Sequence, residues 1–362
     1  MTLNEIALKN FKNYKEEEIK LDRQITLLCG NNGSGKTNLL EAIYYLQTLK
    51  TLRQAELIQW GTPEGAILAT KIEEERPIKY SILISNNERI LKIGEKSIKR
   101  VEEFLKGSSI VAFLPHHLWI IKGGPLLRRE YLDRAIFNGN FNYLHIIKEY
   151  RRILKQRNAS IRQLVNSTDK EVWDRQLIKS AILVIKERQE FIKKIAPLVT
   201  EIYSSLSATK DILTLSYDMS RDAIVEGDDV AIQGYAKLRR IAQEERFRQY
   251  SLWGPHRHDL KILLNGYPLG VAGSQGGQRL GIIALKLAEI ELLKQKGVIP
   301  LILLDDLASE LDPIRRSLIL SCLRGSQHQI VLTTCDPGQW AFKDAKTVTK
   351  YYIVDGKIKT IF

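Results

Sequence analysis

The sequence has few cysteines and no long hydrophobic run. Its 362 residues include only three cysteines, far apart and in no C-x-x-C pair: Cys29, Cys322 and Cys335. This excludes a disulfide framework and favours a reducing compartment, which predicts the cytoplasm. No uncharged apolar run approaches the ~18 residues of a membrane span, and the N-terminus lacks the basic and apolar segments of an export signal. We therefore expect a protein that is neither exported nor membrane-spanning.

Proline and repeated sequence are also scarce. The chain has 10 Pro, 8% aromatic residues, 44% hydrophobic residues and 27% charged residues, without a low-complexity tract. These values exclude collagen-like, mucin-like and largely disordered chains. The length predicts two packed units, or one large α/β unit that carries an insertion.

Acidic residues are outnumbered by basic ones. The chain has 55 Lys and Arg against 42 Asp and Glu, a formal net charge of +13. Such an excess favours a polyanionic partner such as nucleic acid. Many housekeeping proteins share this balance, so charge alone does not decide the partner.

The hydrophobic pattern changes along the chain. Residues 25–29 form a short apolar run, as in a buried strand, and a helical pattern follows Thr37. A β-meander is predicted from four further apolar runs, at 66–69, 80–84, 90–93 and 111–114. Long amphipathic helices are predicted between 115 and 249, and strands at 213–217, 260–264, 300–304 and 329–334. We expect one discontinuous α/β head (1–114 and 281–362) and an inserted, mainly helical lobe (115–280).

A phosphate-binding loop is the strongest motif. The pattern G-x-x-x-x-G-K-[ST] is matched in full, and the candidate nucleotide contacts are Gly30, Asn31, Asn32, Gly33, Ser34, Gly35, Lys36, Thr37 and Asn38. The glycines let backbone N–H groups surround a phosphate, Lys36 reaches the β- and γ-phosphates, and the Thr37 hydroxyl ligates Mg²⁺. The alternative is a glycine-rich turn that binds no nucleotide.

An apolar strand near the C-terminus ends in two carboxylates, Asp305 and Asp306. Asp305 is predicted to hold Mg²⁺ and Asp306 to polarise an attacking water, so with Lys36 they are the candidate catalytic residues. The alternative is that both carboxylates only cap the following turn.

A second glycine-rich segment opens a helix, at Ser274, Gln275, Gly276, Gly277 and Gln278. Small residues at a helix N-terminus form an anion site, and a single nucleotide site has no use for two of them. An ATPase that holds nucleotide between two subunits can use both anion sites. The alternative is a turn that Ser274 caps.

The order of these motifs resembles the ABC-type ATPase heads of SMC-like DNA-repair proteins. Several segments are similar to the RecF family in particular: 9–14, 36–44, 128–133, 254–257 and 304–312. Only about 135 residues stand where a structural maintenance protein carries a long coiled coil, so the lobe is a short lever.

The resemblance implies a fold, an activity and partners. The fold is an ABC-type P-loop ATPase head with mixed β-sheets around a central helix, plus the helical lobe. The activity is ATP binding with Mg²⁺, dimerisation on ATP and slow hydrolysis. The implied partners are gapped or junction DNA, RecO and RecR, with placement of RecA on DNA as the outcome. A further motif at the subunit boundary, the D-loop, is implied at Ser309, Glu310, Leu311 and Asp312.

The chain departs from the family pattern in places. Gly277 replaces a usual Gln, and His258 replaces a usual Asp. Residues 115–118 also differ, which puts in doubt a catalytic role for His116 or His117. At the end of the strand 329–334, the position of the ABC switch histidine is open between Thr333, Thr334 and Asp336.

Two basic helices are candidate DNA contacts. The first carries Lys148, Arg151, Arg152, Lys155, Arg157 and Arg162, and the second carries Arg239, Arg240, Arg246 and Arg248. Neither has a base-reading motif, so we expect contacts to phosphates, although either face could simply be solvated. Two other functions stay open: an ATP-gated DNA clamp with vestigial hydrolysis, and a transporter-type ATPase subunit.

Overall fold

The computed structural model describes residues 2–51, 54–86, 88–163, 167–207, 209–219, 230–307, 311–323, 328–340 and 348–361. The chain divides into two compact units. Unit 1 comprises Met1–His116 and Leu293–Phe362, and unit 2 comprises His117–Leu292. The sequence places the second division at 280/281, whereas the structure places it after Leu292, because one helix runs unbroken through residue 280.

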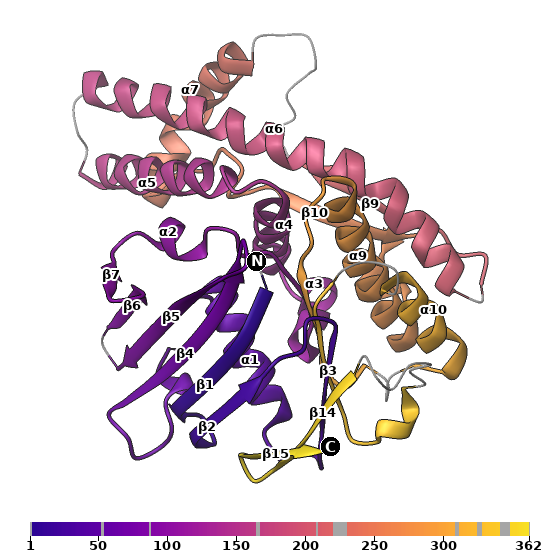
Figure 1. Ribbon diagram of the computed structural model, residues 1–362. Helices are drawn as coiled ribbons and strands as arrows, with labels where there is room; N and C mark the ends of the chain where they lie inside the picture. Colours follow the sequence, from indigo (N-terminus) through magenta and orange to yellow (C-terminus); the bar gives the residue numbers. More distant parts are fainter. Residues whose placement is uncertain are drawn as a thin grey trace. The chain divides into compact units, whose positions relative to one another are not determined.

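Unit 1 contains two six-stranded sheets. The first is antiparallel, in the order β2-β1-β4-β5-β6-β7 (Figure 1). Its strands are β1 (Thr2–Phe11), β2 (Tyr14–Lys20), β4 (Glu64–Glu73), β5 (Arg76–Ser85), β6 (Arg89–Ile93) and β7 (Lys96–Ile98).

The second sheet is mixed, in the order β15-β14-β3-β13-β12-β8. Its strands are β3 (Ile25–Cys29), β8 (Ile110–Phe113), β12 (Leu301–Leu304), β13 (Ile330–Thr334), β14 (Val348–Val354) and β15 (Lys357–Ile361). All are parallel except β15, and β8, β12 and β13 are buried at every residue. Parallel strands are covered on both faces, which explains their continuous apolar sequences.

Helix α1 (Lys36–Thr48) is the central helix of unit 1. It contacts β1 of the first sheet and β8 and β13 of the second. Its buried side chains include Leu39, Leu40 and Ile43, at the helical spacing that the sequence predicts. The remaining helical segments among the described residues of unit 1 are η1 (Gln54–Leu57), α2 (Val101–Leu105), α10 (Pro313–Leu323) and η5 (Pro337–Gln339).

One predicted strand lies in a different sheet. The sequence assigned 111–114 to the meander, but Ile110–Phe113 is β8 and pairs in parallel with β12. Helix α2 separates it from β7, and its four consecutive buried residues lack the alternation of a meander strand. The assignment of 111–114 to the meander was therefore wrong.

Unit 2 is mainly helical, as predicted. Its described helices are α3 (Trp119–Lys122), α4 (Pro125–Gly139), α5 (Tyr143–Arg162), α6 (Ser167–Leu206), α7 (Val230–Arg248), α8 (Leu269–Ala272) and α9 (Gln275–Gln295), with η2 (Pro115–Leu118) at its start. A small antiparallel sheet has the order β11-β10-β9, from β9 (Leu213–Asp218), β10 (Asp259–Leu264) and β11 (Tyr267–Pro268). Within this unit α5 packs along the longer α6, and α6 contacts both α7 and β9 (Figure 1). No described helix is long and apolar enough to span a membrane.

Candidate nucleotide-binding site

The phosphate-binding loop connects β3 to α1. The backbone of Gly30 and Gly35 has positive φ values of 148° and 117°. A Cβ on Gly30 would lie 2.3 Å from the carbonyl oxygen of Ile353, and one on Gly35 would lie 2.5 Å from Asn13 Nδ2. Only glycine fits at these two positions. No described side chain caps the first turn of α1, so its backbone N–H groups remain for an anion.

Lys36 folds back over this loop. Its side chain is almost fully buried, and Nζ donates hydrogen bonds to the carbonyl oxygens of Gly30 (2.7 Å) and Asn31 (2.8 Å). The sulfur of Cys335 lies 3.6 Å from the same Nζ. The ammonium is therefore held at the mouth of the loop, where phosphate oxygens would replace the carbonyl groups as its partners.

Thr37 and Asp305 meet across 268 residues of sequence. The Thr37 hydroxyl lies 2.9 Å and 3.1 Å from the two carboxylate oxygens of Asp305. Burial raises the pKa of the Asp305 carboxyl, whereas hydrogen bonds from Thr333 and Thr37 act in the opposite direction. Asp306, the next residue, has a left-handed backbone with φ 46°.

These groups line one pocket of about 250 Å³ in unit 1. Its lining residues are Asn32, Gly33, Gly35, Lys36, Thr37, Asn38, Pro115, Asp305 and Asp306. Hydroxyl and carboxylate oxygens beside a phosphate loop are the donors that Mg²⁺ prefers, so the residues fit that ion. The structure thus brings together both halves of the site predicted from the two ends of the chain.

The β1–β2 turn contacts this loop, which the sequence did not predict. Asn13 Nδ2 donates to the carbonyl oxygen of Ser34 (3.2 Å), and Asn38 donates to Asn13 Oδ1 (2.7 Å). The Tyr14 hydroxyl donates to the carbonyl oxygen of Gly35 (2.9 Å). The residues involved belong to segment 9–14, one of the segments similar to the RecF family.

The second glycine-rich segment belongs to unit 2. Ser274 Oγ accepts a hydrogen bond from the Gly277 N–H (3.1 Å) near the start of α9. Gln278 donates to the carbonyl oxygens of Gly270 (3.2 Å) and Gly273 (2.9 Å), which holds the turn before the helix. Ser274 therefore caps the start of α9, as the alternative interpretation predicts. A contact of residues 274–278 with nucleotide stays a prediction.

The D-loop prediction is described only in part, since Ser309 and Glu310 lie outside the described residues. Asp312 Oδ1 accepts from the backbone N–H of Arg315 (2.9 Å) at the start of α10. This hydrogen bond lowers the pKa of the Asp312 carboxyl. Asp312 therefore caps α10, and its role at a subunit boundary stays a prediction.

Two of the family-like segments meet inside unit 2. Arg128 makes a two-pronged ion pair with Asp259 (2.7 and 2.8 Å). Asp133, from the same helix α4, accepts from Arg188 on α6 (2.8 Å), and Arg188 also donates to the carbonyl oxygen of Pro255. These residues hold segment 254–257 against α4 and α6, so the structure gives them a role in folding the lobe.

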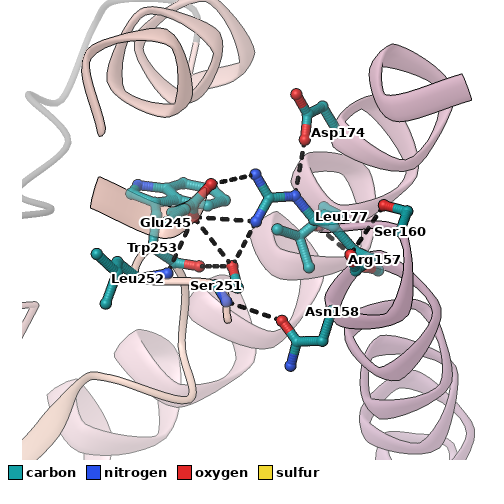
Figure 2. Close-up of polar contacts among 10 residues, drawn as sticks. Arg157, Asn158, Ser160, Asp174, Leu177, Glu245, Ser251, Leu252 and Trp253 are labelled. Carbon is teal, nitrogen blue, oxygen red and sulfur yellow. Dashed lines mark hydrogen bonds and ion pairs between the residues drawn. The ribbon is translucent and has the colours of Figure 1, made fainter. Parts of the chain in front are cut away.

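The basic residues predicted to form one face of α5 divide into an exposed group and a buried arginine. Lys148, Arg151, Arg152 and Lys155 are exposed, although Arg152 pairs with Glu149 (2.7 Å) and Arg151 with Asp133 (3.1 Å). Arg157 is different, because it is fully buried and pairs with Asp174 and Glu245 (Figure 2). Its inclusion among the candidate DNA contacts was wrong, since a buried guanidinium with two carboxylate partners cannot reach a phosphate.

Fold and site together define an ABC-type P-loop ATPase head of the SMC-like class. A family model described as the RecF/RecN/SMC N terminal domain matches residues 2–360. The chain belongs to the RecF family. It is 35% identical to the DNA replication and repair protein RecF of Geobacter sulfurreducens over 100% of both chains. It is also 36% identical to RecF of Halothermothrix orenii over 89% of each.

Solved structures agree with this assignment. A structure of the recombination mediator protein RecF with ATP, in the RecFOR pathway, is 27% identical and has a TM-score of 0.88. The match covers 100% of this chain and 98% of that one. An Smc head bound to the C-winged helix domain of ScpA, at 17% identity and a TM-score of 0.57, shares the fold over 100% of this chain and 97% of its own. The predicted fold class is confirmed.

Proposed function

We propose that the chain is an ATP-dependent, DNA-binding mediator of recombinational repair, and a slow ATPase. The observation that carries this is the meeting of Lys36, Thr37 and Asp305 at one pocket, in a chain similar to RecF along its whole length. The ATP-bound RecF structure supports ATP as the nucleotide.

Thr37 and Asp305 would hold Mg²⁺ with ATP. The ion would neutralise charge on the phosphates, and that is the chemistry it supplies. The Lys36 ammonium exchanges its carbonyl partners for phosphate oxygens, and the N–H groups at the start of α1 bind the same phosphates. Asp306 lines the pocket beside Asp305 and orients the attacking water through its carboxylate.

Ser274 to Gln278 would act on the nucleotide of a second copy of the chain. Unit 1 supplies a complete phosphate loop, whereas the α9 segment supplies a second helix start that one site does not need. ATP held between two copies would therefore make dimerisation depend on nucleotide, and hydrolysis would reset the dimer.

DNA would bind through phosphates. The exposed cations of α5, Lys148, Arg151, Arg152 and Lys155, are the candidate contacts, with gapped or junction DNA as the substrate. By relation to the RecF family, RecO and RecR are proposed as partners and the placement of RecA on DNA as the outcome.

A mixed-mutant ATPase assay tests the shared site. Lys36→Met and Ser274→Arg should each abolish turnover, because each homodimer has two damaged sites. Their heterodimer should recover activity, since both defects fall in one site and the other site is intact. Co-purification of differently tagged chains in the presence of ATP establishes that the heterodimer forms. No recovery in a demonstrated heterodimer would exclude the shared site.

Adding duplex DNA separates the remaining functions. A recombination mediator of this kind should hydrolyse ATP faster with DNA. A clamp with vestigial hydrolysis would bind DNA without turnover, and a transporter-type subunit would ignore DNA.

A further inference from the structure

Thr333 lies between the two halves of the nucleotide site. Strand β13 pairs in parallel with β3, which leads into the phosphate loop, and with β12, which leads to Asp305. Leu332 is paired with Leu304, so Thr333 and Asp305 follow at the same edge of the sheet. The Thr333 side chain is fully buried there.

Its hydroxyl is bonded to two consecutive residues. Thr333 Oγ1 donates to Asp305 Oδ1 (2.7 Å) and accepts from the backbone N–H of Asp306 (2.8 Å). The first bond orients the carboxylate that Thr37 also contacts. The second stabilises Asp306 in its left-handed conformation, which is unfavourable for a residue with a Cβ.

Other groups at the end of β13 have different partners. Thr334 Oγ1 is bonded to the backbone of Asp336, two residues on (3.0 and 3.1 Å). Asp336 accepts from the N–H of Gly338 (2.9 Å) and caps a short turn. Of the three positions that the sequence left open, Thr333 is thus the one whose described hydrogen bonds reach both carboxylate residues.

We propose that Thr333 is a positioning residue for ATP hydrolysis, which fixes Asp305 for the metal and Asp306 for the attacking water through one hydroxyl. The inference rests on the proposed function of the same pocket. Thr333 acts on the nucleotide only through Asp305 and Asp306 and does not contact it directly. Binding of nucleotide without metal should therefore not depend on it.

The test compares Thr333→Val, which keeps the shape of the side chain, with Thr333→Ser, which keeps the hydroxyl. Two quantities are measured for each variant: kcat for ATP, and the gain in affinity for a fluorescent ATP analogue when Mg²⁺ is added. Thr333→Val should lose about 10- to 100-fold in kcat and part of the Mg²⁺ gain, as expected for a group that orients a metal ligand. Its affinity without Mg²⁺ should stay at the parental value, and Thr333→Ser should restore both quantities.

Thr26→Val is the matched control. Thr26 is also fully buried in this sheet, on β3, and its hydroxyl accepts one hydrogen bond, from the Asp22 N–H (2.9 Å). It lies in the strand before the loop and contacts none of the pocket residues through that hydroxyl. The control should keep the parental kcat and Mg²⁺ gain, so a general cost of removing a buried hydroxyl is distinguished from the loss of positioning.

Thermal unfolding of each variant shows whether it is folded, and Thr333→Ala replaces Thr333→Val if the latter does not fold. Parental kcat and Mg²⁺ gain in a folded Thr333→Val or Thr333→Ala chain would overturn the inference. Equal defects in Thr333→Val and Thr333→Ser would also overturn it. A parental chain that neither binds nor hydrolyses ATP would instead refute the proposed function, and the inference would fall with it.

Discussion

Arg157 is fully buried in unit 2, and replacing it with Met removes the positive charge on which two carboxylates depend. Its guanidinium bonds to Glu245 (2.7 and 3.0 Å), to Asp174 (2.7 Å) and to Ser251 Oγ (2.8 Å), as Figure 2 shows. Burial alone would lower the pKa of Arg157, but its bonds to Glu245 and Asp174 raise the pKa instead. The group therefore joins α5, α6, α7 and the segment after α7 in its charged form.

The expected loss in the free energy of unfolding follows from the carboxylates that lose their partner. Glu245 is fully buried, so Arg157→Met leaves an uncompensated charge there, whereas Asp174 keeps some contact with water. Breaking a buried pair in this way costs about 3–5 kcal/mol. Glu245 still accepts from the Leu252 N–H (2.9 Å), so the second substitution should be Glu245→Gln, which keeps that oxygen and removes the charge.

Urea unfolding followed by circular dichroism measures the effect on the free energy of unfolding. Arg157→Met should lower it by about 3–5 kcal/mol, and adding Glu245→Gln should recover part of the loss. Arg152→Met is the control on the same helix, because Arg152 pairs with Glu149 on the surface and its removal should change little. A loss below about 1 kcal/mol, the value of an ordinary hydrogen bond, would refute the reasoning. A double variant no more stable than Arg157→Met would refute it as well.

Two further predictions concern a histidine and a thiol. Burial lowers the pKa of His256 from 6.5 to about 4, so the unfolded chain takes up a proton at higher pH than the folded chain does. The free energy of unfolding should therefore fall as the pH drops from about 6.5 towards 4. His256→Gln should reduce that fall, as measured by urea unfolding at each pH. The same pH dependence in parent and variant would contradict this prediction. Cys335 is exposed, and its sulfur lies 2.9 Å from Oδ1 of Asn32 in the phosphate loop. Bound ATP should therefore slow the alkylation of Cys335 by iodoacetamide, whereas exposed Cys322 should react as before. Peptide mass spectrometry measures both rates. Equal slowing of both thiols, or of neither, would contradict this.

The parts of the site that sequence predicts are those whose chemistry is local. The phosphate loop needs glycines, a lysine and a hydroxyl at fixed spacing, so residues 30–37 identify it without a structure. Asp305 is marked by the apolar strand before it, and the motif order then places the two at one site. Thr37 and Asp305, each predicted to hold Mg²⁺, are in contact in the structure.

Other parts depend on which strands become neighbours. The role of Thr333 follows from the register between β12 and β13, and a one-residue shift would turn its side chain to the other face. The apolar run at 111–114 predicts a strand, but the run does not show which sheet that strand joins. Arg157 has the helical spacing of a basic face, and only the packing of α5, α6 and α7 shows that it is buried.

The division of unit 1 between the two ends of the chain sets an order of events during synthesis. Strand β3 pairs with β13 and β14, and both are translated near the end of the chain. At ~5–20 residues per second, translation from Thr37 to Asp305, 268 positions further on, takes roughly 13–54 s. The contiguous unit 2 is complete earlier, while both edges of β3 still lack the neighbours that they have in the finished sheet. A chain cut short after unit 2 would therefore contain the phosphate loop but lack Asp305, Asp306 and both strands that flank β3.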